Sequence, residues 1–176
     1  KTYVLKKRLP PDDWIRRPSL VEVLSALTKE NHEVRLVGGC IRNTLLGQPV
    51  DDVDLATTAR PGIVVKLLEN ADIRAIPSGI EHGTVTAVIG EDSYHVTSLR
   101  KDITTDGRRA IVKFTDSWMV DAARRDFTFN SLNATPEGTI YDYFDGYMDL
   151  MENKIQFVGN TQERIMEDHL RILRYF

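Results

Sequence analysis

The stretch GGCIRNTLLGQPVDDVDLAT, residues 38–57, constrains the fold of this chain more than any other segment. Two glycines precede a short amphipathic run, which ends at three aspartates, Asp51, Asp52 and Asp54. Strands contain little Asp, because its short side chain competes for backbone hydrogen bonds and its charge resists burial. On a strand, Asp52 and Asp54 would share one face and repel each other. A fold that keeps this pair close is expected to hold a cation between them.

The composition excludes several classes of protein. A chain of 176 residues, 41% hydrophobic and 28% charged, is typical of a soluble globular protein with one ordinary domain, or one domain and part of another. The single cysteine, Cys40, excludes an internal disulfide framework and fits a reducing compartment. No apolar run reaches the roughly 18 residues of a membrane span, and no signal-peptide pattern opens the chain. We therefore expect a cytoplasmic protein with no membrane partner.

The hydrophobic pattern predicts an α+β domain. Ser19 and Glu22 form a capping box that would start a helix, and Thr58 and Pro61 mark the start of another. The remaining helices are predicted over 41–46, 116–132 and 161–176; strands over 33–38, 52–57, 83–90, 94–100, 139–144 and 154–159; and a mobile loop, containing Gly107, over 101–110. The last helical pattern has no cap or breaker, so we expect a fragment of a longer protein.

The acidic pair and the glycines together predict a site that handles phosphates. Carboxylate oxygens with coordination positions left for phosphate oxygens suit Mg²⁺. Gly38 and Gly39 would let the backbone approach a triphosphate at the start of a helix, and two metals could then clamp the attacking and leaving oxygens. The net charge is −3, yet seven Lys and Arg residues lie between Arg100 and Arg125 and place positive charge near the acidic site. Taken alone, the aspartates could also be solvated residues at a strand end.

Four motifs, in order along the chain, resemble the class II tRNA nucleotidyltransferases (CCA-adding enzymes), in the family that they share with bacterial poly(A) polymerases. They are LVGGCIRNTLLGQPVDDVDLATTA, RRDFTFNSL, YDYFDG and EDHLRILR. The resemblance implies a polymerase-β-like nucleotidyltransferase head, a small mixed sheet with flanking helices, over residues 1–158. It also implies the start of an α-helical neck over residues 159–176.

The resemblance implies roles for residues of the first two motifs. Asp52 and Asp54 would be the catalytic carboxylates that hold Mg²⁺. The first motif would also contact the phosphates of the nucleotide, and the second would hold its ribose and triphosphate. The residues concerned are Gly38, Gly39 and Arg42 in the first motif, and Arg125, Asp126 and Asn130 in the second. Asp126 and Asn130 are four apart, so on a helix they would converge on one ligand.

The fourth motif implies how the base is selected. Asp168 and Arg171 are three residues apart and on a helix would orient each other by a salt bridge. Together they can donate to and accept from the Watson–Crick edges of C or A, and in the family such a pair selects CTP and ATP. Arg174 would reach the phosphates. The bland alternative for this pair is an ordinary surface ion pair.

The function implied is addition of CCA to tRNA 3′ ends from CTP and ATP. Poly(A) polymerase, addition of only CC or only A, and a non-catalytic RNA-binding module that keeps the fold are the alternatives. Two positions depart from the family pattern: Asn43 stands where Asp is common, and His95 stands where the family usually has Glu. His95 puts a third-carboxylate role in doubt and leaves the pair of aspartates intact.

Overall fold

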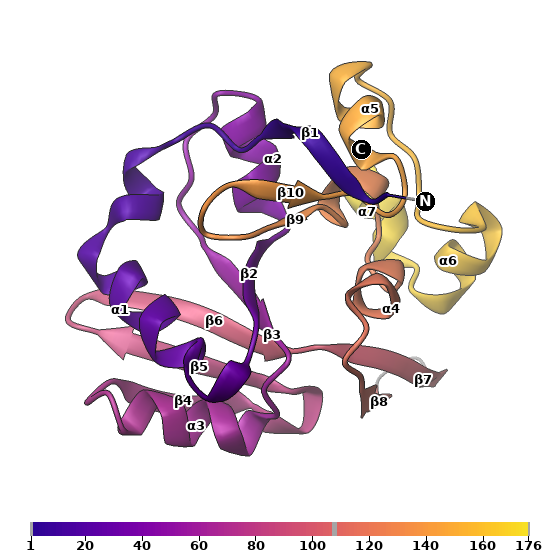
Figure 1. The fold of residues 1–176 in the computed structure, drawn as a ribbon. Coiled ribbons are helices and arrows are strands. Elements are labelled where there is room, and N and C mark those ends of the chain that lie inside the picture. The colour runs from indigo at the N-terminus through magenta and orange to yellow at the C-terminus, as the bar shows by residue number, and fades with distance from the viewer. Residues whose placement is uncertain (1, 107–108, 176) are drawn as a thin grey trace.

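One mixed sheet dominates the computed structural model, which describes residues 2–106 and 109–175 (Figure 1). Its strand order is β1-β10-β9-β2-β3-β6-β5-β4. The pairing of β3 with β6 is parallel, whereas the other pairings between these strands are antiparallel. The strands are β1 (Val4–Arg8), β2 (Val34–Val37), β3 (Asp54–Thr57), β4 (Arg74–Gly79), β5 (Thr84–Ile89), β6 (Asp92–Ser98), β9 (Asn133–Ala134) and β10 (Thr139–Tyr141).

Helices α1 (Pro18–Leu27) and α3 (Pro61–Glu69) pack together against one face of this sheet (Figure 1). Their apolar sides are buried with those of the central strands, and the core includes Leu20, Val64, Leu36, Leu55 and Val85. The capping box predicted at Ser19 and Glu22 is wrong. Pro18 opens α1 instead, and the Ser19 hydroxyl donates to Asp92 Oδ2 at 2.6 Å, which ties the helix to the β5–β6 hairpin.

The opposite face of β2 presents Arg35 rather than an apolar residue. Its guanidinium is buried between the rings of Trp118 and Tyr141, at 4.1 and 3.7 Å from their centroids. It donates to Asn133 Oδ1 at 2.9 Å and to Glu33 Oε2 at 3.1 Å. Cation–π contacts of this kind are strongest when they are desolvated. Arg35 therefore links β2 to its neighbouring strands β9 and β10, and holds the helix that begins at Trp118 against this face of the sheet.

Most of the segment expected as a mobile loop over 101–110 lies instead in two paired strands. Strands β7 (Arg100–Asp106) and β8 (Arg109–Phe114) pair antiparallel and extend from the body of the molecule (Figure 1). The prediction gave too much weight to polarity, because the β-branched residues of ITT (103–105) and IV (111–112) favour strands even where they are polar or exposed. Gly107, on which the loop prediction partly rested, lies outside the described residues.

The helix predicted over 116–132 ends early. Helix α4 spans Trp118–Ala123, and a short 3-10 turn, η4 (Thr128–Asn130), follows after a non-helical stretch. The backbone of residues 126–128 pairs with residues 156–158: Thr128 N donates to Gln156 O at 2.9 Å, and Val158 N to Asp126 O at 2.8 Å. These tertiary hydrogen bonds replace helical ones. The strand predicted over 154–159 is accordingly only a single bridge, between Phe127 and Phe157.

The third motif builds a helix that the sequence pattern did not predict, α5 (Gly146–Met151). The carboxylate of Asp142 accepts hydrogen bonds from the backbone N–H groups of Gly146 and Tyr147, at 2.9 and 3.0 Å. Gly146 packs on the second motif so closely that a Cβ there would lie 2.1 Å from the carbonyl oxygen of Thr128. The third motif is thus a support for the second.

The helix predicted over 161–176 is interrupted. Helices α6 (Thr161–Glu167) and α7 (Leu170–Tyr175) are separated at Asp168, whose backbone is extended, with φ −151° and ψ 103°. Its carboxylate accepts a hydrogen bond from Leu170 N at 3.0 Å, as a helix-capping Asp does. None of the helices in the described ranges is long and apolar enough to span a membrane.

Candidate active site

The two glycines of the first motif have different structural requirements. Gly38 has φ 75° and ψ −131°, a conformation that side chains disfavour, and it lies just before helix α2 (Gly39–Leu45). Gly39 has no such strain. A Cβ there would lie 3.3 Å from Nη2 of Arg42, so the missing side chain leaves room for the Arg42 guanidinium. Gly38 therefore allows the turn into α2, and Gly39 lets the Arg42 side chain lie against the backbone.

The aspartates of the first motif line a cavity of about 280 Å³ with Gly39, Arg42 and Asn43. Asp54 is the first residue of β3, opposite Val37, whereas Asp52 precedes the strand rather than lying within it as predicted. Asp52 and Asp54 are exposed and the intervening Val53 is buried, so the alternation expected of a strand extends to Asp52. Asp51, which directly precedes Asp52, also lines this cavity and is exposed.

This donor set fits a magnesium ion that shares its coordination with a substrate. Within the described ranges, no three His, Cys, Asp or Glu side chains converge as they would in a metal cage made only by protein. Mg²⁺ seldom uses such cages; it takes one or two carboxylates and completes its shell with water and phosphate oxygens. Two exposed carboxylates beside an arginine-lined cavity match that requirement.

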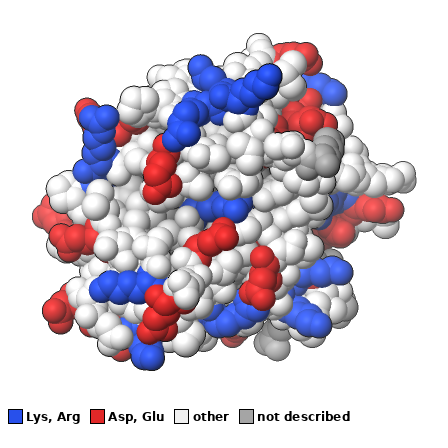
Figure 2. Space-filling model, in the orientation of Figure 1, with Lys and Arg blue, Asp and Glu red and all other residues white. Residues whose placement is uncertain are grey.

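His95 lies beside Asp54. The two residues are opposite each other in the parallel β3–β6 ladder, and His95 Nδ1 is 3.5 Å from Asp54 Oδ1. Both face a cavity of about 520 Å³, which is also lined by Arg100, Arg124 and Arg125. Part of the predicted basic region thus does lie near the acidic site, whereas Arg108 is outside the described residues. Over the face in Figure 2, charges of both signs are interspersed.

A hydrogen-bond chain joins the first, second and fourth motifs. Arg42 Nη1 donates to Asn130 Oδ1 at 2.9 Å, and Asn130 Nδ2 donates to Asp126 Oδ1 at 3.1 Å. Arg174 Nη1 lies 3.4 Å from Asp126 Oδ2. Asp126 and Asn130 therefore converge, although not on one face of a helix as expected: the chain turns between them, and η4 brings Asn130 back.

The arginines of the second motif are anchored by Asp121, which is buried. Its carboxylate accepts from Arg124 Nε at 3.1 Å and from the backbone N–H of Arg100 at 3.0 Å, and lies 3.7 Å from Arg125 Nη2. Burial, and then the charge of Arg124, lower the pKa of Arg125 and lower that of Arg100 to about 10. Three cationic groups held close together in this way are suited to an anionic ligand.

Comparison with known proteins assigns the chain to a family of nucleotide-polymerising enzymes. The family described as "Poly A polymerase head domain" matches residues 34–156. The chain belongs to the poly(A) polymerase head-domain family. It is 46% identical over 175 residues to the mouse mitochondrial CCA tRNA nucleotidyltransferase 1, covering 99% of the chain and 40% of that protein. It is 44% identical over 154 residues to a CCA-adding enzyme of Oceanobacillus iheyensis, covering 86% of the chain and 38% of that enzyme.

Solved structures agree with this assignment of the head domain. The Bacillus stearothermophilus CCA-adding enzyme in complex with CTP superposes with a TM-score of 0.77 at 35% identity, over 90% of this chain and 38% of that one. The Thermotoga maritima CCA-adding enzyme complexed with tRNA shares the fold, with a TM-score of 0.71 at 22% identity over 96% and 38% of the two chains. The chain thus spans about two fifths of the length of these relatives.

In the fourth motif, the expected pair of Asp168 and Arg171 does not form. Arg171 Nη1 donates instead to Glu167 Oε2 at 3.0 Å and to the carbonyl of Arg164 at 2.8 Å. Asp168 caps α7, so the two residues are not neighbours on one helix face. Burial would raise the pKa of Glu167, but hydrogen bonds from Arg171 and Arg164 outweigh it and lower that pKa.

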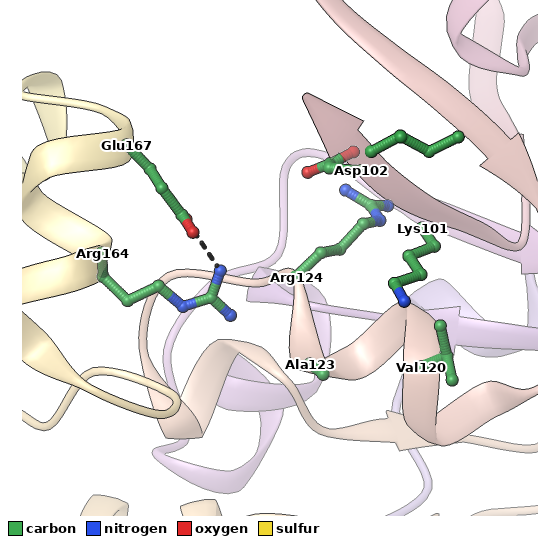
Figure 3. A pocket seen from close by; sticks show the side chains of 8 residues that line it. Lys101, Asp102, Val120, Ala123, Arg124, Arg164 and Glu167 are labelled. Carbon is green, nitrogen blue, oxygen red and sulfur yellow. Dashed lines mark hydrogen bonds and ion pairs between the residues drawn. The ribbon is translucent and has the colours of Figure 1, made fainter. Parts of the chain in front are cut away.

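A further cavity, of about 310 Å³, lies between α6, α4 and β7. Figure 3 shows Arg164 and Glu167, which are 3.2 Å apart, on one side and Lys101 and Arg124 on the other. Sequence reasoning missed two of the residues that organise this region, Asp121 and Glu167. The spacing D-x-x-R-R at 121–125 was the available signal for Asp121, because residues three and four apart meet on a helix.

Proposed function

We propose that this chain is the catalytic head of a nucleotidyltransferase that adds CCA to tRNA 3′ ends from CTP and ATP and releases pyrophosphate. One observation carries the proposal: Asp52, Asp54 and Arg42 line one cavity, and Arg42 is hydrogen-bonded to the second motif through Asn130. Carboxylates for a metal and a cationic, hydrogen-bonding wall for a nucleotide thus stand side by side. The names of the relatives support CCA addition as the reaction.

Asp52 and Asp54 would hold Mg²⁺, which when bound neutralises the triphosphate and lowers the pKa of the attacking hydroxyl. The protein's own contribution is to position the reactants. Gly38 and Gly39 give the nucleotide access to the backbone, and Arg42 and Arg125 face its phosphates. No protein side chain needs to act as a covalent nucleophile, because phosphoryl transfer is promoted by orientation and charge stabilisation.

The second and fourth motifs would hold the rest of the nucleotide. Asp126 and Asn130 can accept from and donate to the ribose hydroxyls, and Arg174 reaches toward them from α7. For Asp168 and Arg171 to read a base together, both must leave their present partners, Leu170 N and Glu167. We propose that they do so when a nucleotide binds and α6 and α7 join into one helix.

We propose a division at residue 158, with a head over 1–158 and the start of a helical neck over 159–176. Asn160 supports it, because its side chain caps α6 by accepting from Gln162 N and Glu163 N. We propose the cytoplasm as the compartment. The mouse relative is named as mitochondrial, so imaging of a tagged full-length protein in its own cells would decide between the two.

An extension assay tests the function. The full-length protein that carries this chain is mixed with tRNA lacking its 3′ CCA, Mg²⁺, and CTP and ATP separately and together. Addition of C, C and A with both nucleotides is the expected product. A long ladder of A would indicate a poly(A) polymerase instead, and addition that stops at CC, or adds only A, would indicate a partial activity.

Two variants sharpen the assay. Asp54→Asn should reduce extension by several orders of magnitude, because it removes a metal carboxylate. Asp51→Asn removes the same charge from the same cavity at a residue with no proposed role, and should retain most activity. Equal losses in both variants would contradict the assignment of Asp54, and a folded wild-type protein without any extension would favour the non-catalytic RNA-binding module.

A further inference from the structure

We propose that Asp54 and His95 form a mixed oxygen–nitrogen position for a divalent cation, which binds Mn²⁺ more tightly than Mg²⁺. The inference rests on the proposed function, since that function places a metal at Asp54. It goes further by assigning His95 as a direct ligand and by naming the class of ion that the ligand favours.

The first support is geometry. His95 and Asp54 are paired across two parallel strands, so their Cα positions are fixed by the sheet. Nδ1 and Oδ1 are 3.5 Å apart. Two donors that each lie about 2.1 Å from one ion are about 3 Å apart when they meet it at a right angle, and farther apart at wider angles. The observed separation lies within the range that two ligands of a single ion can have.

The second support is access. The side chains of His95 and Asp54 are 61% and 51% exposed, and both line the cavity of about 520 Å³. An ion there can complete its shell with water and with oxygens of a substrate.

The third support is the arrangement of the neighbouring charges. Arg124 and Arg125 line the same cavity, and their nearest carboxylate is Asp121 rather than Asp54. Arg100 donates to the carbonyl of His82. In the described part of the chain, Asp54 forms its ion pair with His95 rather than with an arginine, although its charge also acts on Arg125 at longer range. No arginine of the described residues is therefore in direct contact with this carboxylate, and the arginines of the cavity can meet phosphates.

The chemical nature of the two ligands determines which divalent ion the site prefers. Carboxylate and water ligands suit Mg²⁺, whereas an imidazole nitrogen is a ligand for first-row transition ions, whose affinity for a given nitrogen and oxygen site rises from Mn²⁺ onward. One nitrogen among oxygens should favour Mn²⁺ without excluding Mg²⁺.

Electron paramagnetic resonance of Mn²⁺ tests the proposal on the protein alone, at pH 8 and without RNA. Titration with Mn²⁺ gives the affinity from the loss of the free-ion signal, and competition with Mg²⁺ gives the selectivity. Pulsed measurements detect coupling to a directly bound ¹⁴N nucleus. We expect ¹⁴N coupling in the wild-type protein. His95→Gln should abolish it and weaken Mn²⁺ binding at least about tenfold, the lower end of the loss seen when groups that support a metal are removed.

Further variants separate the possible outcomes. His95→Glu keeps a donor, so it should still bind an ion, without ¹⁴N coupling and with the preference shifted toward Mg²⁺. His32→Gln, at the far end of β2 from Asp54, is the matched control and should change nothing. Bound Mn²⁺ without ¹⁴N coupling in the wild-type protein, or equal affinity in His95→Gln, would overturn the proposal. CCA addition that still required Asp54 would then leave the proposed function standing. Conversely, ¹⁴N coupling without any extension would retain the metal position and reject the function.

Discussion

Arg174 Nη1 and Asp126 Oδ2 lie 3.4 Å apart, although 48 residues separate them in the chain. The contact joins the fourth motif to the second. Asp126 in turn accepts a hydrogen bond from Asn130, which accepts one from Arg42. Three motifs that are dispersed in the sequence thus form one hydrogen-bonded network next to Asp52 and Asp54. The position of α7 is thereby linked to the cavity where the nucleotide is expected.

Replacing Arg174 should weaken nucleotide binding and leave the stability of the folded protein nearly unchanged. The Arg174 side chain is 56% exposed, and exposed ion pairs contribute at most about 1 kcal/mol, so Arg174→Gln should change the free energy of unfolding by less than that. We expect nucleotide affinity to fall about tenfold, because a charge-assisted contact contributes about 1.5 kcal/mol or more. Denaturant unfolding and calorimetric titration with CTP measure the two effects. A large loss of stability with unchanged CTP affinity would contradict the assignment.

Gly146 should not tolerate even alanine. A Cβ there would lie 2.1 Å from a backbone oxygen of the second motif, which cannot move aside as a flexible side chain can. Gly146→Ala is expected to destabilise the protein by about 3 kcal/mol or more, the upper end of the cost of overpacking. Gly62→Ala is the control: it meets nothing within 4 Å in α3 and should stabilise by about 0.4–1 kcal/mol. Urea unfolding of both variants gives the comparison.

The lowered pKa of Glu167 predicts a loss of stability in acid. The Glu167 carboxylate binds a proton less readily in the folded protein than in the unfolded chain. Its contribution to the free energy of unfolding is therefore fully present above the ordinary pKa of 4.5, and is lost as the pH falls through the lowered pKa. Thermal unfolding of Glu167→Gln should differ from wild type at pH 6 and converge with it in acid. Glu163→Gln, on the same exposed helix, has no recorded ion pair in the described residues and should show no such convergence.

Cys40 should resist thiol reagents in the folded protein. It is buried in the core, and burial, followed by the charge of Asp54, raises the pKa of its thiol to about 12. The reactive thiolate is therefore scarce at pH 8. Labelling with a disulfide reagent should be slow in buffer and reach one thiol per chain in denaturant. Rapid labelling of the native protein would show that the α2 helix opens easily.

Local patterns predicted most of the sheet, whereas the grouping of the first, second and fourth motifs was implied by the family resemblance. The buried strand before Gly38 and the β5–β6 hairpin follow from short-range patterns, and the structure confirms them. The predictions failed where distant segments supply the hydrogen bonds. Residues 126–128 look helical by composition, but they bond to residues 156–158 instead.

The same limit explains the fourth motif. An Asp within a helical pattern can cap a new helix instead of continuing the old one, and Asp168 does so here. Spacing alone also could not show that Arg171 would pair with Glu167, since both carboxylates lie within reach of one arginine along the chain. The contact between His95 and Asp54 depends on the strand order, which brings β6 beside β3 and which a single sequence does not reveal.

The burial of Arg35 has a practical consequence. One of its stacking partners, Trp118, is the first residue of α4 and donates its indole N–H to Glu33 Oε2 at 3.0 Å. The other tryptophan, Trp14, is buried and donates to Thr44 Oγ1 at 3.0 Å. The chain therefore carries two tryptophan fluorophores in separate places, one that senses the docking of α4 and one that senses the core beneath α2. Variants that keep only one of the two tryptophans would allow the opening of each region to be followed separately by tryptophan fluorescence.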